Sequence, residues 1–280
     1  RAFPRLSARP LSARLPALLE AQAEGEPVLF LRDASCEYFY PEVGEAAIRA
    51  LQAAGCNVKV LPVIGAGRTL ISKGFLEAAR RQARIVLAAV EGMDPEGRAA
   101  VVGVEPSEIY TLREEYLDLI GGEEGVERLA GRAWVGGEYL KRPGESGNLR
   151  ITTLMARKQT SGALKPGERS VQVFLHGHCY QKAQPPAQDG YPTGVQATLA
   201  MLQAAGYLVE LIESGCCGMA GAFGFEAEHY EVSMRVGELK LLPAVRHAPA
   251  HAIIAASGVS CQGQIEDGAG RPAVHPLTLL

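Results

Sequence analysis

The feature that most constrains the fold is an internal repeat. The segment ALQAAGCNVKVL at residues 50–61 matches MLQAAGYLVELI at residues 201–212, an offset of 151 between positions 50 and 201. Each copy continues with the same elements: an apolar strand, an amphipathic helix closed by glycine, a second strand, a long helical stretch and a third strand. Strands that alternate with helices in this way predict a parallel sheet in each half.

The fold class that follows is α/β, with two tandem, pseudo-duplicated, Rossmann-like parallel-sheet domains. We expect a linker at residues 1–26, a first domain at 27–120, a connecting segment at 121–170 and a second domain at 171–280. The first residues have the arginine, alanine and serine bias of a transit peptide. Because position 1 is not Met, we interpret them instead as a linker within a longer polypeptide.

Composition excludes several classes of function. The chain has a formal net charge of −3 and no basic stripe, so nucleic acid is not expected as a partner. No apolar run approaches the roughly 20 residues of a transmembrane segment. Six cysteines in 280 residues are too few for a secreted disulfide scaffold, which indicates a reducing compartment. We expect a cytoplasmic protein, with any membrane association made through partners.

Cysteines follow each predicted strand of the second half. Cys179 comes after the first strand, Cys216 and Cys217 after the second, and Cys261 after the third. Because the carboxyl ends of parallel strands share one edge, these four thiols are expected to converge there. The glycines around the adjacent pair, including Gly218, allow the backbone turn that lets both cysteines face one site.

Thiolate sulfur is the ligand that zinc, Cu(I) and iron–sulfur clusters prefer. The glycine-rich surroundings and the lack of Cys-x-x-Cys pairs favour iron–sulfur. Three alternatives stay open. The same cysteines could bind structural zinc in an interaction module that has lost redox function. The vicinal pair Cys216 and Cys217 could act in thiol chemistry, although this leaves the other two cysteines unexplained. A dinucleotide fingerprint fits poorly, because a cysteine replaces its first glycine.

The segments LHGHCYQKA, SGCCGMAGAFGFEAEHYEVSMRVGE and GVSCQGQI resemble the CCG-domain, or cysteine-rich domain, family. That family includes the iron–sulfur subunit of glycolate oxidase, one of the subunits of heterodisulfide reductase and the C-terminal part of FAD-linked D-lactate dehydrogenase-like oxidoreductases. The chain looks most like the last group, because PEVGEAAIRALQAAG, LISKGFLEAARR and REEYLDL also match its first repeat. The resemblance covers residues 26–280.

The resemblance implies a [4Fe–4S] cluster held by Cys179, Cys216, Cys217 and Cys261. Gln264 stands where the pattern has its last cysteine, which favours a four-ligand cluster. The family also implies an electron-transfer component of an oxidoreductase for 2-hydroxy acids such as D-lactate or glycolate. FAD would lie in a separate domain or subunit, and the electron acceptor would be a quinone or another iron–sulfur protein. The chain alone is not expected to oxidise substrate.

The first repeat keeps little of this pattern. Cys36 corresponds to Cys179, whereas Gly65 and Ala66 replace the paired cysteines and Glu108 replaces Cys261. One thiol cannot hold a cluster, so we expect the first domain to keep its fold without its metal. Glu108 could take up a hard cation or lie near the remaining site, but a solvated loop carboxylate is the favoured interpretation.

Several polar residues adjoin the predicted cysteine site. His176 and His178 could tune a cluster or carry a proton, or could simply hydrogen-bond a strand-end carbonyl. Lys182 could offset the negative charge of the thiolates or be an ordinary exposed lysine. With Gly218 and Gln264, these residues form the expected surroundings of the ligands.

Overall fold

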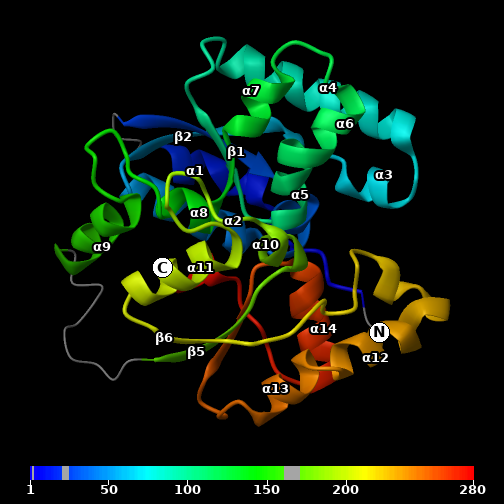
Figure 1. The fold of residues 1–280 in the computed structure, drawn as a ribbon. Coiled ribbons are helices and arrows are strands. Elements are labelled where there is room, and N and C mark those ends of the chain that lie inside the picture. Colours follow the sequence, from blue (N-terminus) through cyan, green and yellow to red (C-terminus); the bar gives the residue numbers. More distant parts are fainter. Residues whose placement is uncertain (2, 21–24, 161–170) are drawn as a thin grey trace. The chain divides into compact units, whose positions relative to one another are not determined.

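A computed structural model describes residue 1 and residues 3–20, 25–160 and 171–280. The chain divides into two compact units (Figure 1). The first unit is Arg5–Arg150, and the second unit is Ile151–Leu280 together with Arg1–Pro4. Among the described residues, no helix has the length and apolar character needed to span a bilayer.

The first unit contains a four-stranded sheet in the order β2-β1-β3-β4, with every neighbouring pair parallel. Its strands are β1 (Glu26–Arg32), β2 (Cys56–Ile64), β3 (Ala100–Gly103) and β4 (Ala133–Val135). Its longer helices are α2 (Pro41–Ala53) and α4 (Leu76–Met93). The shorter helical segments are η1 (Leu11–Ala13), α1 (Leu15–Leu19), η2 (Ser35–Phe39), α3 (Arg68–Ser72), α5 (Pro106–Tyr110), η3 (Thr111–Glu115), α6 (Tyr116–Ile120), α7 (Val126–Gly131) and α8 (Gly136–Leu140).

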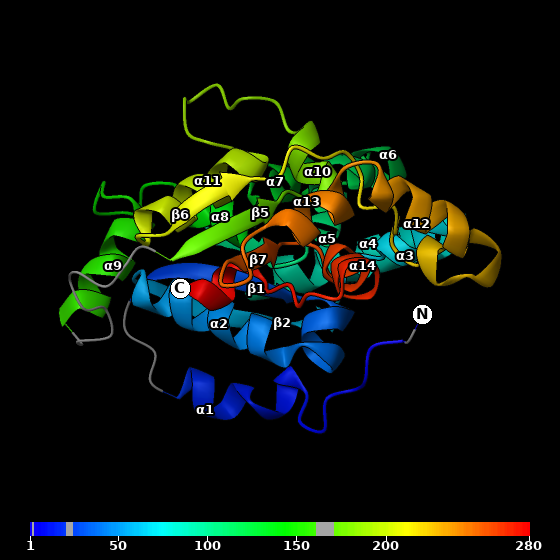
Figure 2. The same ribbon diagram turned by 90° about the horizontal axis from the view of Figure 1, so that it is seen from below.

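Hydrophobic patterning explains the layers of this unit. The central strand β1 buries four consecutive residues, as a parallel strand covered on both faces does. The two long helices each bury one apolar stripe. Figure 2 shows α2 beside β1 and β2. Right-handed crossovers place α2 and α4 on opposite faces of the sheet when the chain first moves from β1 to β2 and then returns past β1 to β3.

The second unit contains a three-stranded parallel sheet in the order β6-β5-β7. Its strands are β5 (Gln172–His176), β6 (Leu208–Leu211) and β7 (Ile253–Ala256). Its helices are α9 (Arg150–Thr160), which begins at the last residue of the first unit, α10 (Cys179–Ala183), α11 (Gly194–Ala204), η4 (Phe223–Phe225), η5 (Ala227–His229), α12 (Tyr230–Glu238), α13 (Leu241–His247), α14 (Val259–Ala269) and η6 (Pro276–Leu279). Both units are therefore α/β, with parallel sheets compatible with a Rossmann-like fold.

The core of the second unit includes two of the predicted site cysteines. Cys217 and Cys261 are buried in the same apolar cluster as Phe174, Ile254 and Ile265. The predicted site thus lies on the edge of a packed core, which fixes the positions of these two side chains.

Parts of the segments expected to be connectors pack within the first unit. Within residues 1–26, Leu11 and Leu18 are buried, and Leu11 packs against Gly44 of α2. Within residues 121–170, β4 pairs with β3 as a strand of the first sheet. The arginine, proline and glycine residues of these segments indicated loops. The few apolar residues among them are buried only by contacts with residues remote in sequence. Residues 161–170 of the expected connector lie outside the described residues.

We expect Leu11→Ala to destabilise the first unit by about 2–5 kcal/mol, because Leu11 is buried and its loss leaves a cavity. Leu6→Ala is the matched control, since Leu6 is 71% exposed. The free energy of unfolding from urea denaturation tests both. Equal stability of the two variants would mean that the N-terminal segment is a linker after all.

Candidate metal centre

The carboxyl ends of the three strands position the four cysteines of the second unit. Cys179 is the first residue of α10, just beyond β5, and Cys261 lies in the first turn of α14, just beyond β7. Cys216 and Cys217 lie in the loop after β6. Because β5 lies between β6 and β7, these three connections meet at the point where the strand order reverses.

The four thiols are close enough to influence one another's pKa values. Cys179 affects Cys216, Cys216 affects Cys217, and Cys217 affects Cys216 in return, while Cys261 affects both Cys179 and Cys217. Cys179 and Cys216 are exposed, whereas Cys217 and Cys261 are buried. The cysteine cluster therefore runs from the core to the solvent, and its outer side is accessible.

Glycine allows the backbone to turn between the paired cysteines. Gly218 has a φ of 101°, and a Cβ at this position would lie 2.2 Å from the carbonyl oxygen of Ser233. Its N–H donates to the sulfur of Cys216 over 3.3 Å. Both the positive φ and the close approach exclude a side chain, so Gly218 sets the direction of Cys216 and Cys217.

Hydrogen bonding shifts the pKa values of these thiols in opposite directions. Donation from the Cys179 and Cys217 thiols holds the pKa of Cys216 well below its usual range. The same bonds, together with burial, raise the pKa values of Cys179 and Cys217. These interactions favour the thiolate form of Cys216 over those of Cys179 and Cys217. Thiolates that are held this closely are the form in which cysteine binds soft metals.

His176 adds a nitrogen to the buried side of the cysteine cluster. One nitrogen of its ring and the sulfurs of Cys217 and Cys261 all lie within 4.8 Å of one another. Its Nδ1 lies 2.9 Å from the hydroxyl of Ser214, and its buried Nε2 has no hydrogen-bond partner. Burial, with a smaller effect of the Lys182 charge, lowers the pKa of His176 to about 3, so the ring is neutral.

Lys182 connects α10 to the loop that carries the paired cysteines. Its ammonium donates to the carbonyl oxygens of Ser214 and Gly215 over 2.6 and 2.9 Å. Burial lowers the pKa of Lys182, while the nearby cysteines oppose that shift. The Lys182 side chain is therefore held by the loop rather than freely exposed, and its role in offsetting the charge of the thiolates stays a prediction.

His178 and Gln264 have structural contacts at opposite sides of the site. His178 caps α10, accepting from the N–H of Tyr180 over 3.3 Å, and its Nδ1 lies 3.9 Å from the Cys179 sulfur. Gln264 is buried and donates to the Ser233 carbonyl over 2.9 Å. Its amide nitrogen lies 3.2 Å from the position that a Cβ of Gly218 would occupy. The residue at the last cysteine position of the pattern thus packs against the cysteine loop.

The corresponding edge of the first unit brings together the residues expected to be vestigial. Cys36 follows β1 and is buried, Gly65 and Ala66 follow β2, and Glu108 lies in α5 after β3. The Glu108 carboxylate accepts a hydrogen bond from the Ala66 N–H. The interpretation of Glu108 as a solvated loop residue is therefore wrong, because the carboxylate turns inward to bond the loop that replaces the paired cysteines.

The environment of Glu108 favours its neutral form. Burial, together with the nearby charge of Asp33, raises the pKa of Glu108 to about 7, although the bond from Ala66 opposes the shift. Asp33 is also buried; one of its oxygens accepts from the backbone of Ser35 and Cys36, and the other has no hydrogen-bond partner. A carboxylate, that of Glu108, thus follows β3 in the first unit, as the Cys261 sulfur follows β7 in the second.

Sequence reasoning missed two residues of these sites. Ser214 contacts both His176 and Lys182, and Asp33 holds the turn around Cys36. Each could have been found from its spacing, since Ser214 lies two residues before the paired cysteines and Asp33 three residues before Cys36. Small polar residues at strand ends often bond the following turn.

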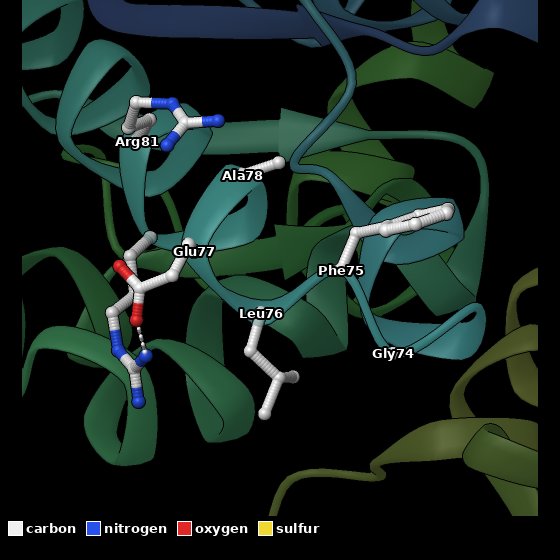
Figure 3. A pocket seen from close by; sticks show the side chains of 7 residues that line it. Gly74, Phe75, Leu76, Glu77, Ala78 and Arg81 are labelled. Carbon is white, nitrogen blue, oxygen red and sulfur yellow. Dashed lines mark hydrogen bonds and ion pairs between the residues drawn. The ribbon is translucent and has the colours of Figure 1, made fainter.

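A separate hollow of about 430 Å³ lies at the start of α4 in the first unit (Figure 3). Its lining contains no cysteine or histidine, and its Glu77 and Arg80 pair with each other over 2.5 Å. Phe75 is 63% exposed beside it. The hollow offers no ligand set for a metal, so the cysteine cluster is the stronger candidate.

Known proteins with similar sequences are dehydrogenases, although no protein-family model matches the chain. The chain is 26% identical to D-2-hydroxyglutarate dehydrogenase of Escherichia coli (strain K12) over 263 residues, covering 94% of this chain and 23% of that protein. It is 26% identical to a subunit of the anaerobic glycerol-3-phosphate dehydrogenase of the same strain over 259 residues, covering 91% and 58%. D-2-hydroxyglutarate dehydrogenase of Pseudomonas putida is 27% identical over 275 residues, covering 96% and 24%.

These relatives indicate the class of protein to which the chain is similar and the share of their length that it matches. The similarity extends over nearly the whole chain and is consistent with an oxidoreductase component. The chain spans about a quarter of the length of the D-2-hydroxyglutarate dehydrogenases and 58% of the glycerol-3-phosphate dehydrogenase subunit.

We expect Gly218→Ala to reduce metal binding severalfold and to cost on the order of 1–3 kcal/mol, because alanine strains the positive φ and collides with Ser233. Gly215→Ala is the matched control, since nothing lies within 4 Å of a Cβ there. Metal analysis and thermal unfolding test both. Full metal binding by Gly218→Ala would show that the turn does not set the cysteines.

We expect Glu108→Gln to become progressively more stable than the wild type as the pH rises from 5 to 8. A carboxyl whose pKa is raised by folding contributes stability at low pH and loses it as the pH rises through about 7. Glutamine keeps the acceptor for Ala66 without the charge, so the difference should grow by about 1–2 kcal/mol. Urea denaturation at both pH values measures it.

Glu77→Gln provides the control for that comparison, because the Glu77 side chain is 77% exposed. Its stability relative to the wild type should change little over the same range. A Glu108→Gln variant that also shows no trend with pH would mean that Glu108 is solvated.

Proposed function

We propose that the chain is the electron-transfer component of an FAD-linked 2-hydroxy-acid oxidoreductase, with a [4Fe–4S] cluster bound by Cys179, Cys216, Cys217 and Cys261. The observation that carries the proposal is the placement of these four cysteines just beyond the carboxyl ends of three paired parallel strands, with the sulfurs of Cys217 and Cys261 within 4.8 Å of each other. The relatives' names support an oxidoreductase.

The residues present fit such a cluster. Four sulfur donors match the Cys₄ ligation of [4Fe–4S] clusters, and Gly218 and Gly258 keep side chains away from the cysteines. Lys182 of α10 places its ammonium group against the cysteine loop, and one ring nitrogen of His176 lies within 4.8 Å of two of the sulfurs. When bound, the cluster supplies storage of one electron at a time. The cysteines act as its ligands and the surrounding polar groups fix its environment.

The proposal places substrate oxidation outside this chain. The relatives named D-2-hydroxyglutarate dehydrogenase are about four times as long as the region they share with this chain, which leaves room for a flavin domain. We propose that a flavin-containing domain or subunit oxidises the 2-hydroxy acid. Electrons would then pass through the second unit to a quinone or another iron–sulfur protein. D-2-hydroxyglutarate is itself a 2-hydroxy acid, which supports that substrate class.

We further propose that the two units are a tandem pseudo-duplicated pair of CCG domains, of which only the second binds metal. The strand orders β2-β1-β3 and β6-β5-β7 support a common plan. In the first unit, Glu108 bonds the Ala66 loop at the place where the second unit has paired cysteines. The domain boundaries at residues 27–120 and 171–280 remain part of this proposal.

Structural zinc is the second candidate, and one observation favours it. His176, Cys217 and Cys261 present three potential ligand atoms within 4.8 Å, and zinc binds nitrogen and sulfur together. In that case the chain would be an interaction module without redox activity.

We expect anaerobically prepared protein to contain about four irons and four acid-labile sulfides per chain, and Cys216→Ser to lose most of both. Cys36→Ser is the matched control: Cys36 is a buried thiol in the corresponding position of the first unit, and its loss should leave the iron content unchanged. Metal and sulfide analysis with the absorption spectrum near 400 nm measures the result. One zinc without sulfide would refute the cluster.

A further inference from the structure

The four cysteine ligands proposed for the candidate metal centre do not specify the role of the buried His176 side chain. Its ring is completely buried at the end of β5, and its Nε2 lacks a hydrogen-bond partner. A neutral imidazole can bind a metal through a bare nitrogen or donate a hydrogen bond through a protonated one, but a given nitrogen cannot do both. The position of the single ring proton therefore decides the role.

Contacts of Lys182 and Ser214 locate that proton. The Lys182 ammonium can only donate, and it approaches the Ser214 hydroxyl to 3.4 Å. The Ser214 hydroxyl therefore has its own proton left to give. Two acceptors are within reach: the His176 Nδ1 at 2.9 Å and the Ile212 carbonyl at 3.5 Å.

Geometry favours the histidine as the acceptor. The Ile212 carbonyl already accepts the backbone N–H of Ser214 over 2.9 Å, and 3.5 Å is long for a hydroxyl bond. The Ser214 hydroxyl therefore donates to Nδ1, which places the ring proton on Nε2. The buried Nε2 has no hydrogen-bond partner among the described residues, and the sulfurs of Cys217 and Cys261 lie within 4.8 Å of one nitrogen of the same ring.

We infer that His176 is not a metal ligand but a hydrogen-bond donor, which presents Nε2–H to the sulfur ligands, and that Lys182 and Ser214 fix it in this tautomer. A buried N–H needs an acceptor, and metal-bound thiolate sulfur or cluster sulfide supplies one. Hydrogen bonds to sulfur stabilise the more negative, reduced cluster and so raise its reduction potential. The part of the inference that concerns a cluster rests on the proposed function, whereas the part that concerns the tautomer of His176 does not.

The first measurement is the tautomer of His176 by ¹⁵N NMR of the metal-free, labelled protein. A protonated Nε2 with an unprotonated Nδ1 is the expected result, and Ser214→Ala should allow both tautomers. Protonation at Nδ1 in the wild type would overturn the inference, whether or not any metal binds.

The second measurement uses the metal-loaded full chain with His176→Leu and His176→Gln. We expect both variants to keep the wild-type iron and sulfide content. His176→Leu should disfavour reduction about tenfold, which corresponds to 59 mV for a one-electron couple. His176→Gln should lose less, because glutamine retains an N–H. Ser214→Ala should give an intermediate shift.

His251→Leu is the matched control, because His251 is exposed and precedes β7 at its amino end. Its potential should equal that of the wild type. Loss of metal from His176→Leu, in protein whose thermal unfolding is unchanged, would make His176 a ligand and overturn the inference. If the wild type binds zinc without sulfide, the proposed function fails. Zinc content in His176→Leu then decides the inference, with retention supporting it and loss overturning it.

Discussion

Parallel pairing of β5 with β6 on one side and β7 on the other is the constraint on which the candidate metal centre depends. It directs three connections of the second unit to one edge and reverses the strand order at β5. Cysteines that are far apart in the chain consequently lie near one another, with the sulfurs of Cys217 and Cys261 within 4.8 Å. The apolar cluster of this unit includes Cys217 and Cys261, so the packing of the core also positions these two thiols.

The surroundings of the cysteines are as specific as the cysteines themselves. The positive φ of Gly218 and its close approach to the Ser233 carbonyl exclude a side chain at this turn. Gln264 packs against the turn and donates a hydrogen bond to the same carbonyl. Lys182 ties α10 to the cysteine loop through backbone carbonyls. Apart from the bond that the Gly218 N–H donates to the Cys216 sulfur, these contacts hold the site in shape without using the sulfurs.

The first unit shows the same plan with different chemistry. Its strand ends also converge, but Glu108 reaches back to the backbone of Ala66, and Asp33 organises the turn around Cys36. Two carboxyl groups in a buried site repel each other when charged, which explains why burial and Asp33 together raise the pKa of Glu108. A carboxyl group that is readily protonated can replace a ligand set without leaving a buried charge.

The sequence by itself determined that both halves are α/β with parallel sheets, and it predicted that Cys179, Cys216, Cys217 and Cys261 follow the carboxyl ends of three neighbouring strands. Periodicity and repeat spacing carry that information, because strand ends share an edge whatever the side chains are. Tertiary structure alone decided the inward turn of Glu108, the packing of Leu11 on α2, the inclusion of β4 in the first sheet, and the contacts around His176. Each of these depends on the distance between groups remote in sequence. Hydrogen bonds and van der Waals contacts are decided over a few tenths of an ångström, which no spacing of residues along a chain specifies.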